Sequence, residues 1–327
     1  MTDRTIFITG ANGYVGRNLI RHFIGAGRPV IGMVRNQTAA ERVAALGARP
    51  VIGDMLTSDL TPLMQGADHL IHAAANLDHG AGRAALAANR DGTARVMASA
   101  QQAGIGAVVH ISTDSVLQAG MPLRDVNETA PYPARPAGAY SAGKAEAERI
   151  ALQAAQTMRV MILRPRMVWG RDDGTALPTL ATMVRNGRFA WISNGNYLSS
   201  TTHIANLCHA VDLALERGQA GRIYHITDGP ARPFRDIVTG LMATQDLSVP
   251  EKSVPRGVLR LIARFGDALH RFSGGRLHGP LSFQEYATSA LEISLNTTRA
   301  QRELGYAPVI SWEAGLEELH LGSWSSR

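Results

Sequence analysis

A tyrosine and a lysine stand four residues apart in the stretch AYSAGKAEAER, residues 139–149. Residues at this spacing share one face of a helix, so Tyr140 and Lys144 can meet at the same ligand. Tyrosine exchanges protons poorly near neutral pH because its unperturbed pKa is about 10. A nearby ammonium favours the phenolate and lowers that pKa. The pair is therefore predicted to form a proton relay in which Tyr140 is the acid or base.

The choice of lysine at this position is unusual for the chain. Lysine and arginine together number 33, and only Lys144 and Lys252 are lysine. Arginine is planar, bulkier and effectively never deprotonated, so it is a poor substitute where a compact ammonium is needed. The alternative is that Lys144 is an ordinary surface cation, but its spacing from Tyr140 favours the relay.

Three glycines punctuate the stretch FITGANGYVGRNL, between a predicted strand and a predicted helix. At Gly10, Gly13 and Gly16 the absence of a side chain lets the backbone turn tightly and approach a pyrophosphate at the helix N-terminus. A plain packing turn is the alternative. Because the loop opens the first strand–helix unit, we predict a dinucleotide-binding site.

Short apolar runs alternate with helix-length segments through the first half of the chain. The predicted strands are residues 5–9, 29–34, 50–52, 69–74, 107–112 and 160–163. The predicted helices are residues 14–26, 38–47, 84–103 and 140–157. This alternation, with nearly continuous apolar strands, indicates an α/β protein with a doubly wound parallel Rossmann sheet. Its ligand is expected at the carboxyl ends of the strands.

After residue 165 the pattern changes, with more glycine and proline and fewer clear strands. A helix over 203–217 and a strand over 222–227 return to the sheet. We therefore predict a dinucleotide-binding domain over 1–165, joined by 202–228. The rest forms a smaller, interleaved C-terminal substrate lobe over 166–201 and 229–327.

The spacing TGxxGxxG together with Tyr-x-x-x-Lys resembles the extended branch of the short-chain dehydrogenase/reductase superfamily. This branch includes the NAD-dependent epimerase/dehydratase family and its 3β-hydroxysteroid dehydrogenase-like members. The resemblance runs from end to end of the chain. The further matching stretches are LIHAAA at 70–75, NRDGT at 89–93, HISTDSV at 110–116, RPRMVWG at 164–170, TTHIANLCHA at 201–210, YHITDG at 224–229 and LGYAP at 304–308.

The resemblance implies roles for four catalytic residues. Tyr140 exchanges the proton with the reacting oxygen, and Lys144 also holds the nicotinamide ribose. Thr113 hydrogen-bonds the substrate oxygen; its neighbour Ser112 is the alternative, although strand alternation points it to the other face. Asn89 supports the lysine side of the relay, or is a plain surface amide of a helix.

The resemblance also implies the cofactor contacts. Asp54, after the third strand, matches the acid at the adenine amino group; otherwise it is an ordinary loop residue. The expected cofactor-binding residues are Gly10, Asn12, Gly13, Tyr14, Val15, Gly16, Arg35, Asp54, Met55, Ala73, Ala74, Ala75, Lys144, Pro165 and Val168.

The second strand indicates which nicotinamide binds. An acid about 20 residues past the glycines would accept hydrogen bonds from the ribose 2′-hydroxyl of NAD. No aspartate or glutamate occurs between Arg4 and Ala40, and the second strand ends in GMVRN. Arg35 is thus placed to pair with a 2′-phosphate, with Arg17 as a second cation. We predict NADP(H) in preference to NAD(H), the alternative being a merely solvated Arg35.

Two departures from related sugar-nucleotide enzymes narrow the chemistry. The dehydratases carry Asp-Glu after the threonine, whereas this chain has Asp114-Ser115 and lacks that carbon base. Sugar-nucleotide enzymes also usually have an asparagine where this chain reads RPRMVWG. Both favour an oxidoreductase that interconverts a carbonyl and an alcohol on a small or medium organic molecule. A nucleotide-sugar epimerase or dehydratase is the alternative, followed by a non-catalytic NADP sensor. The identity of the substrate, hydrophobic or not, stays open.

Composition limits the partners. The net charge is +6 and the pI about 9.9, but the arginines are scattered, so no nucleic-acid partner is expected. No apolar run reaches membrane-spanning length, and no targeting segment precedes the first strand, so we expect a cytoplasmic protein without integral membrane association. The expected partner is a small-molecule substrate, and a homodimer is left open.

The single cysteine, Cys208, lies in a helical pattern and is predicted to be a buried structural thiol. His69 and His72 are three apart in a strand and face opposite ways. No metal-ligand spacing occurs among the eleven histidines, so no metal is expected.

In the second lobe, residues 254–272 form an amphipathic helical pattern. Arg256, Arg260 and Arg264 share one stripe. Another face carries Leu261, Ile262, Phe265 and Leu269. We expect this apolar face to pack on the lobe; the alternatives are an entrance for an anionic or greasy substrate and a helix on a membrane surface. Met167, Trp169 and Trp191 fall where the family builds its substrate pocket, or belong to the core.

Overall fold

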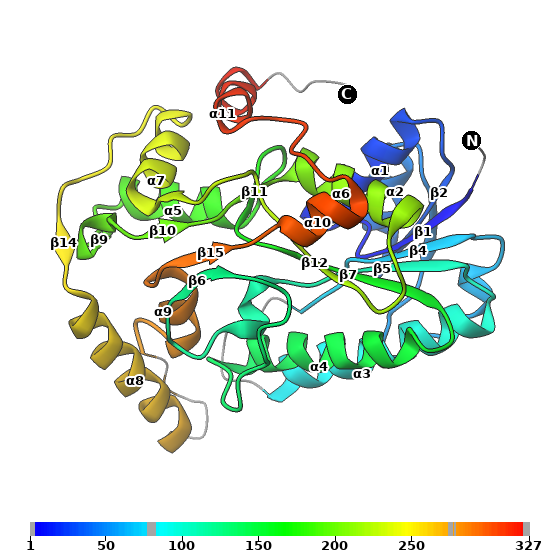
Figure 1. The fold of residues 1–327 in the computed structure, drawn as a ribbon, viewed down its shortest axis with the longest axis horizontal. Helices are drawn as coiled ribbons and strands as arrows, with labels where there is room; N and C mark the ends of the chain where they lie inside the picture. Colours follow the sequence, from blue (N-terminus) through cyan, green and yellow to red (C-terminus); the bar gives the residue numbers. More distant parts are fainter. Residues whose placement is uncertain (1–3, 77–82, 274–276, 278, 323–327) are drawn as a thin grey trace.

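In a computed structural model of the chain, which describes residues 4–76, 83–273, 277 and 279–322, a seven-stranded parallel sheet forms the larger part (Figure 1). The strand order is β12-β7-β5-β4-β1-β2-β3, so the chain winds outward from β1 in both directions. This confirms the predicted doubly wound fold. The strands are β1 (Ile6–Thr9), β2 (Val30–Val34), β3 (Arg49–Ile52), β4 (His69–His72), β5 (Ala107–Ile111), β7 (Arg159–Pro165) and β12 (Ile223–Ile226).

Helices cover both faces of this sheet. On one face pack α1 (Tyr14–Gly25), α2 (Gln37–Ala44), α6 (Ile204–Arg217) and α10 (Thr298–Leu304). On the other pack α3 (Arg83–Gln102) and α4 (Ala139–Ala154).

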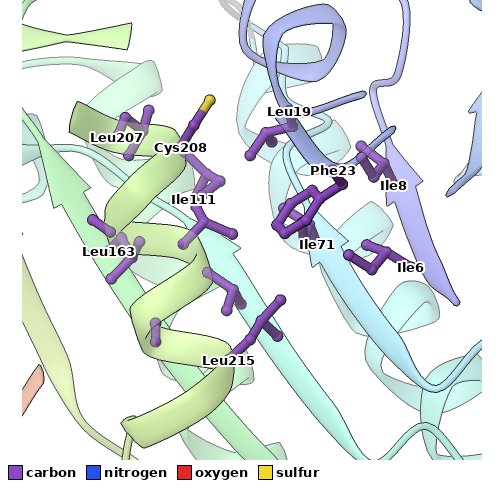
Figure 2. Close-up of a cluster of buried hydrophobic side chains, with 14 of the residues drawn as sticks. Ile6, Ile8, Leu19, Phe23, Ile71, Ile111, Leu163, Leu207, Cys208 and Leu215 are labelled. Carbon is purple, nitrogen blue, oxygen red and sulfur yellow. The ribbon is translucent and has the colours of Figure 1, made fainter. Parts of the chain in front are cut away.

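The alternation of side chains along each strand supplies both hydrophobic cores. Ile6 and Ile8 join the α1–α6 core, and Phe7 between them joins the α3–α4 core. Figure 2 shows the first of these cores, where Cys208 lies among leucines and isoleucines. Cys208 is buried as predicted, and burial raises the pKa of its thiol to about 12, so little of it is in the nucleophilic thiolate form near neutral pH.

A second lobe is built on a four-stranded sheet of order β13-β10-β15-β6. Its strands are β13 (Arg232–Pro233), β10 (Leu198–Ser199), β15 (Ile293–Leu295) and β6 (Leu123–Val126). Strand β6 lies within the segment assigned from the sequence to the dinucleotide-binding domain, yet it pairs in parallel with β15. A segment from the first half of the chain thus contributes the edge strand of this sheet.

Two short parallel pairs complete the lobe, β8 (Val168–Trp169) with β11 (Thr202–His203) and β9 (Trp191–Ile192) with β14 (Ser253–Val254). Its helices are α5 (Ala176–Arg185), α7 (Phe234–Ala243), α8 (Arg256–Phe272), α9 (Phe283–Ser289) and α11 (Trp312–Leu321). Trp169 and Trp191 are 1% exposed within its core, and Met167 packs against that core. The tryptophans are therefore core residues.

One half-buried carboxylate joins the lobe to the Rossmann sheet. Asp228, just after β12, accepts hydrogen bonds from Trp169 Nε1 at 2.7 Å and Thr201 Oγ1 at 2.8 Å. Its other oxygen accepts from the His203 backbone at 2.5 Å and Asn206 Nδ2 at 2.8 Å. Because His203 and Asn206 sit at the start of α6, this cluster fixes that helix against β8.

The predicted apolar face of α8 packs on the lobe only in part, because Ile262 and Leu269 are half-buried whereas its other two members are largely exposed. Leu261 and Phe265 are 69% and 71% exposed. The helix also contacts its neighbours through the opposite face, where Ala263 and Gly266 are buried. A Cβ at Gly266 would lie 2.8 Å from the Leu281 carbonyl oxygen, so small residues on this face allow the close approach.

The described residues contain neither a helix that could span a membrane nor a cluster of metal ligands. None of the helices described is long and apolar enough to cross a bilayer. No group of three or more metal-ligating side chains is found in the part of the chain that the structure covers. His69 faces Arg4 and Arg28, whereas His72 bonds Thr9 and Thr93, which confirms that the two histidines point to opposite faces.

Candidate active site

The glycine loop between β1 and α1 fits a pyrophosphate. Gly10 has a φ of +70°, and a Cβ there would lie 2.8 Å from the Ala74 backbone. A Cβ on Gly16 would lie 2.2 Å from the Gly10 carbonyl oxygen. Gly13 caps α1 without a side-chain hydrogen bond, and the first turn contains no acid. The free N–H groups of that turn are therefore available to an anion.

The segment after β4 closes the other side of this loop. Ala73, Ala74 and Ala75 are half-buried, and the Ala74 N–H donates to Thr9 Oγ1 at 3.2 Å. The Asn12 Oδ1 atom and the Tyr14 hydroxyl are buried and find no partner in the described residues. Such orphaned polar atoms beside the glycine loop are consistent with a ligand that supplies their partners.

The remaining expected cofactor residues lie around the same edge of the sheet. Val15 and Val168 pack against the α1–α6 core, and Pro165 ends β7 in a buried position. Asp54 is half-buried and accepts the Leu56 N–H at 2.7 Å. Met55 packs against α3, where a Cβ on Gly92 would lie 2.7 Å from its sulfur.

The two arginines differ in their availability. Arg35 follows β2 directly and is exposed, and Asn36 beside it caps α2. Arg17 is already engaged, because its Nε lies 3.3 Å from Asp172 and its Nη1 donates to the Asn12 carbonyl at 2.7 Å. Arg35 is thus the more available of the two cations.

Tyr140 and Lys144 lie on the first turns of α4, and both are buried. Lys144 Nζ donates to the carbonyl of Ile111, the last residue of β5, at 2.7 Å. Burial lowers the pKa of Lys144 to about 8, and the Glu148 carboxylate opposes this shift. The pair thus stands at the carboxyl end of a central strand, where the fold predicts the ligand.

The pKa of Tyr140 moves upward in this structure. Burial is the main cause and the Asp114 carboxylate adds to it, while a hydrogen bond shared with Thr113 opposes them. The lowering by Lys144 that the sequence suggests is not the direction found here. The phenol is therefore held protonated, as a proton donor must be.

Thr113 reaches Tyr140 from the end of β5. It caps a short 3₁₀ helix over Asp114–Leu117, and its Oγ1 accepts the Ser115 N–H at 3.2 Å. Ser112 Oγ is buried and finds no partner in the described part of the chain. The geometry therefore brings Thr113 to the relay.

Asn89 is buried on α3 and contacts the segment after β4. Its Oδ1 accepts the Asn76 N–H at 2.7 Å, and its Nδ2 donates to the Asn76 carbonyl at 3.0 Å. It is not a surface amide. A Cβ on Gly143 would lie 3.4 Å from the Asn89 Cβ, so Asn89 lies against α4 beside Lys144. Its support of the lysine stays a prediction.

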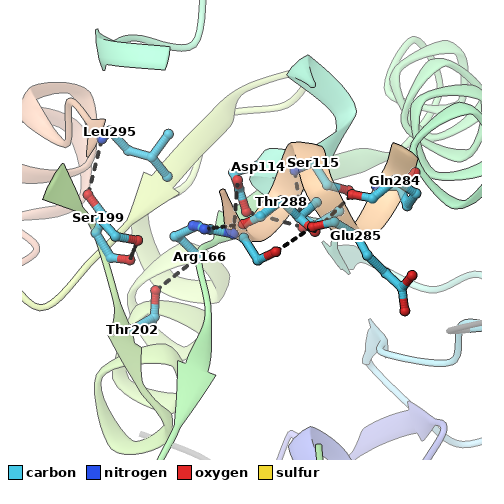
Figure 3. A network of polar contacts seen from close by, with 12 residues as sticks. Asp114, Ser115, Arg166, Ser199, Thr202, Gln284, Glu285, Thr288 and Leu295 are labelled. Carbon is cyan, nitrogen blue, oxygen red and sulfur yellow. Dashed lines mark hydrogen bonds and ion pairs between the residues drawn. The ribbon is translucent and has the colours of Figure 1, made fainter. Parts of the chain in front are cut away.

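Arg166 and Gln284 are two site residues that the sequence did not reveal. Arg166 Nη1 lies 3.6 Å from the buried Asp114 carboxylate, and its Nη2 donates to the Thr288 carbonyl at 2.6 Å (Figure 3). Gln284 on α9 accepts the Ser141 N–H on α4 at 3.2 Å. Arg166 lies in the family-matching stretch RPRMVWG, but nothing there set it apart from the many other arginines, and Gln284 is 143 residues from its partner.

Several unsatisfied polar atoms lie in the segments that adjoin the start of α4 and the end of β5. Ser115 Oγ, Ser141 Oγ and both amide atoms of Gln118 are buried and have no hydrogen-bond partner among the described residues, and the same holds for Gln284 Nε2. Buried polar groups are nearly always paired, so this concentration indicates where a polar part of a ligand would bind.

The fold and this site together define a class, the nicotinamide-dependent Rossmann enzymes with a tyrosine–lysine pair. The family model described as NAD dependent epimerase/dehydratase matches residues 6–227. The chain belongs to this family, in the extended branch of the short-chain dehydrogenases/reductases, and is an enzyme of the NAD(P)-dependent dehydrogenase/reductase type.

Three similar proteins illustrate the range of the family. A 4-hydroxy-2-methyl-3-oxo-4-farnesyl-3,4-dihydroquinoline-1-oxide ketoreductase of Stigmatella aurantiaca is 39% identical over 316 residues, covering 96% of this chain and 95% of the relative. A 3-beta-hydroxysteroid dehydrogenase of Mycolicibacterium neoaurum is 27% identical, covering 96% and 89%. A double mutant of dTDP-glucose 4,6-dehydratase from Streptomyces venezuelae, solved with NAD, has a TM-score of 0.76 at 23% identity, covering 97% and 95%, and shows the shared fold.

Proposed function

We propose that this enzyme is an NADP(H)-dependent ketoreductase that interconverts a carbonyl and an alcohol on a hydrophobic organic molecule. The observation that carries the proposal is the placement of Tyr140 and Lys144, both buried on the first turns of α4, with Lys144 Nζ 2.7 Å from the carbonyl oxygen of Ile111 at the carboxyl end of β5. The position of the carbon base in related dehydratases holds Ser115, whose hydroxyl cannot take that role near neutral pH. Simple hydride transfer is therefore favoured over dehydration.

In the direction of reduction, the glycine loop and Lys144 would hold a reduced nicotinamide cofactor, which would supply the hydride for the carbonyl carbon. Tyr140 is held protonated by its raised pKa, and it donates its phenolic proton to the carbonyl oxygen as that oxygen gains negative charge. Thr113 holds the same oxygen through its hydroxyl. Lys144, still mostly protonated at neutral pH with a pKa of about 8, stabilises the phenolate that is left.

Two observations support the choice of cofactor and substrate. Arg35 is exposed at the end of β2, and no acid occupies the stretch where an NAD-specific enzyme carries one. The relatives are named for a farnesylated dihydroquinoline oxide and a hydroxysteroid, both largely apolar molecules. A ketone on an apolar skeleton is therefore the substrate class we propose.

The test is the variant Tyr140→Phe, which keeps the ring and removes the proton donor. We expect kcat/KM for NADPH-dependent reduction of hydrophobic ketones to fall by about 100-fold or more. The Kd for NADPH, measured by fluorescence, should stay within a small factor because the glycine loop is untouched. The same incubations should include aldehydes and UDP-sugars, with products identified by mass spectrometry. Undiminished ketone reduction by the variant, or turnover of UDP-sugars alone, would overturn the proposal.

A further inference from the structure

Helix α8 carries a continuous apolar stripe that faces away from the protein. Val258, Leu261, Phe265 and Phe272 are 46%, 69%, 71% and 90% exposed. Their spacing of three, four and seven residues places all four on one face of the helix. An ordinary surface helix turns such a face toward the core, so this orientation is the reverse of the usual one.

The rest of α8 explains why the stripe points outward. The opposite side of the helix holds the buried Ala263 and the half-buried Leu259, which belong to a core shared with α9. Asp267 accepts the Phe283 N–H at the start of α9, at 3.2 Å. Figure 1 shows α8 at one end of the molecule, with its long axis along the margin of the second lobe. The stripe is thus held in place while remaining exposed.

Positive charge lies along one edge of this stripe. Arg260 and Arg264 each precede a stripe residue, and neither has a carboxylate partner in the described part of the chain. Arg264 is exposed, whereas Arg260 is half-buried and its Nε atom is buried without a hydrogen-bond partner among the described residues. The guanidinium of Arg264 lies 5.9 Å from the centre of the Phe283 ring, at the start of α9. This contact holds the aliphatic part of the Arg264 side chain against α9. The single acid of the helix, Asp267, is turned toward α9. The exposed side of α8 is therefore apolar with a basic edge.

We propose that α8 docks this enzyme onto an anionic lipid surface, with the apolar stripe in the acyl boundary and the arginines at the headgroups. An exposed apolar face with flanking arginines matches the chemistry of such a surface, and the whole chain carries a net charge of +6. A second copy fits less well. In an antiparallel two-fold contact the arginine edge of one helix would face that of the other, so like charges would meet.

The test measures binding of the full chain to vesicles by sedimentation. Vesicles of phosphatidylglycerol and phosphatidylcholine are compared with vesicles of phosphatidylcholine alone. We expect the wild type to prefer the anionic vesicles, with binding that weakens as salt is raised. Leu261→Gln/Phe265→Gln should lower the partition coefficient by about tenfold or more, since two large apolar side chains are lost. Arg260→Gln/Arg264→Gln should remove most of the preference for anionic lipid, about fivefold per arginine.

The matched control is Val309→Gln/Leu321→Gln, which removes two apolar side chains that are 46% and 63% exposed outside α8. It should bind vesicles like the wild type. Thermal unfolding of each variant confirms that the fold is intact. The proposal is overturned if the wild type ignores anionic vesicles or if the stripe variant binds as well as the wild type. Analytical ultracentrifugation tests the alternative that a second copy of the chain covers the stripe. If the wild type is a dimer that does not bind vesicles, and the stripe variant is a monomer, the stripe is a protein interface and the proposal is overturned.

Discussion

At the scale of single residues, the site is defined by how burial changes ionisable groups. Burial lowers the pKa of Lys144 to about 8, which brings it closer to neutral pH. Burial raises the pKa of Tyr140, which moves it further from neutral pH. The sequence predicted that Tyr140 and Lys144 share one helix, and both are buried on the first turns of α4, because spacing on a helix is local information. It could not predict the direction of the Tyr140 shift, which depends on Asp114 and on burial by distant elements.

Arg35 is the residue whose replacement should change the choice of cofactor. Arg35→Ala removes a charge-assisted contact to the ribose phosphate, so we expect the Kd for NADPH to rise by about 10- to 100-fold. The Kd for NADH should hardly change. Arg42→Ala is the matched control, because Arg42 is an exposed arginine of α2 that follows the same strand. Equal effects of both variants, or equal effects of Arg35→Ala on NADPH and NADH, would contradict the assigned role.

At the scale of elements, the Rossmann half was largely predictable. Each strand and helix there has its own apolar pattern, and parallel strands pair in the order that short right-handed crossovers allow. The second lobe was not. Strand β6 pairs with β15, about 170 residues away, and the contact of Gln284 with α4 spans 143 residues. The pattern over 254–272 correctly marked two faces of α8 but not which face its neighbours cover.

The junction of β1 and α1 gives a prediction about glycine. Gly16→Ala places a Cβ 2.2 Å from the Gly10 carbonyl oxygen, so the start of α1 must move away from the loop. We expect NADPH binding to weaken by about tenfold or more and the free energy of unfolding to fall by about 1–3 kcal/mol. Gly25→Ala, at the end of the same helix, meets nothing within 4 Å. It should leave binding intact and change stability by at most about 1 kcal/mol. Titration of both variants with NADPH measures binding, and urea unfolding measures stability. Equal binding and equal stability of the two variants would contradict the steric argument.

At the scale of the whole molecule, neutral histidines are buried throughout both lobes. Burial lowers the pKa of His72 and His225 to about 3 and that of His203 to about 4. The pKa of His110 is also lowered, first by burial and then by Lys144. These side chains stay neutral in the folded protein under conditions in which the unfolded chain takes up protons.

The consequence is a stability that falls on the acid side of neutrality. Because the unfolded state binds more protons between about pH 6.5 and pH 4, the free energy of unfolding rises with pH in this window and is lost as the pH falls. Each histidine contributes up to about 1.4 kcal/mol per pH unit. Urea unfolding at pH 7.5, 6 and 5 should show this loss, with a shallower slope for His225→Gln. A stability that is level from pH 7.5 to 5 would contradict the burial of these rings.

The scarcity of lysine has a spectroscopic consequence. With Lys144 buried and Lys252 exposed, and no other lysine in the chain, lysine labelled at Nζ with nitrogen-15 gives at most two side-chain signals. The replacement Lys252→Arg leaves one, from the ammonium beside Tyr140. The protonation of that single amine, and its response to nicotinamide and to ketone, can then be followed directly by magnetic resonance in the intact enzyme.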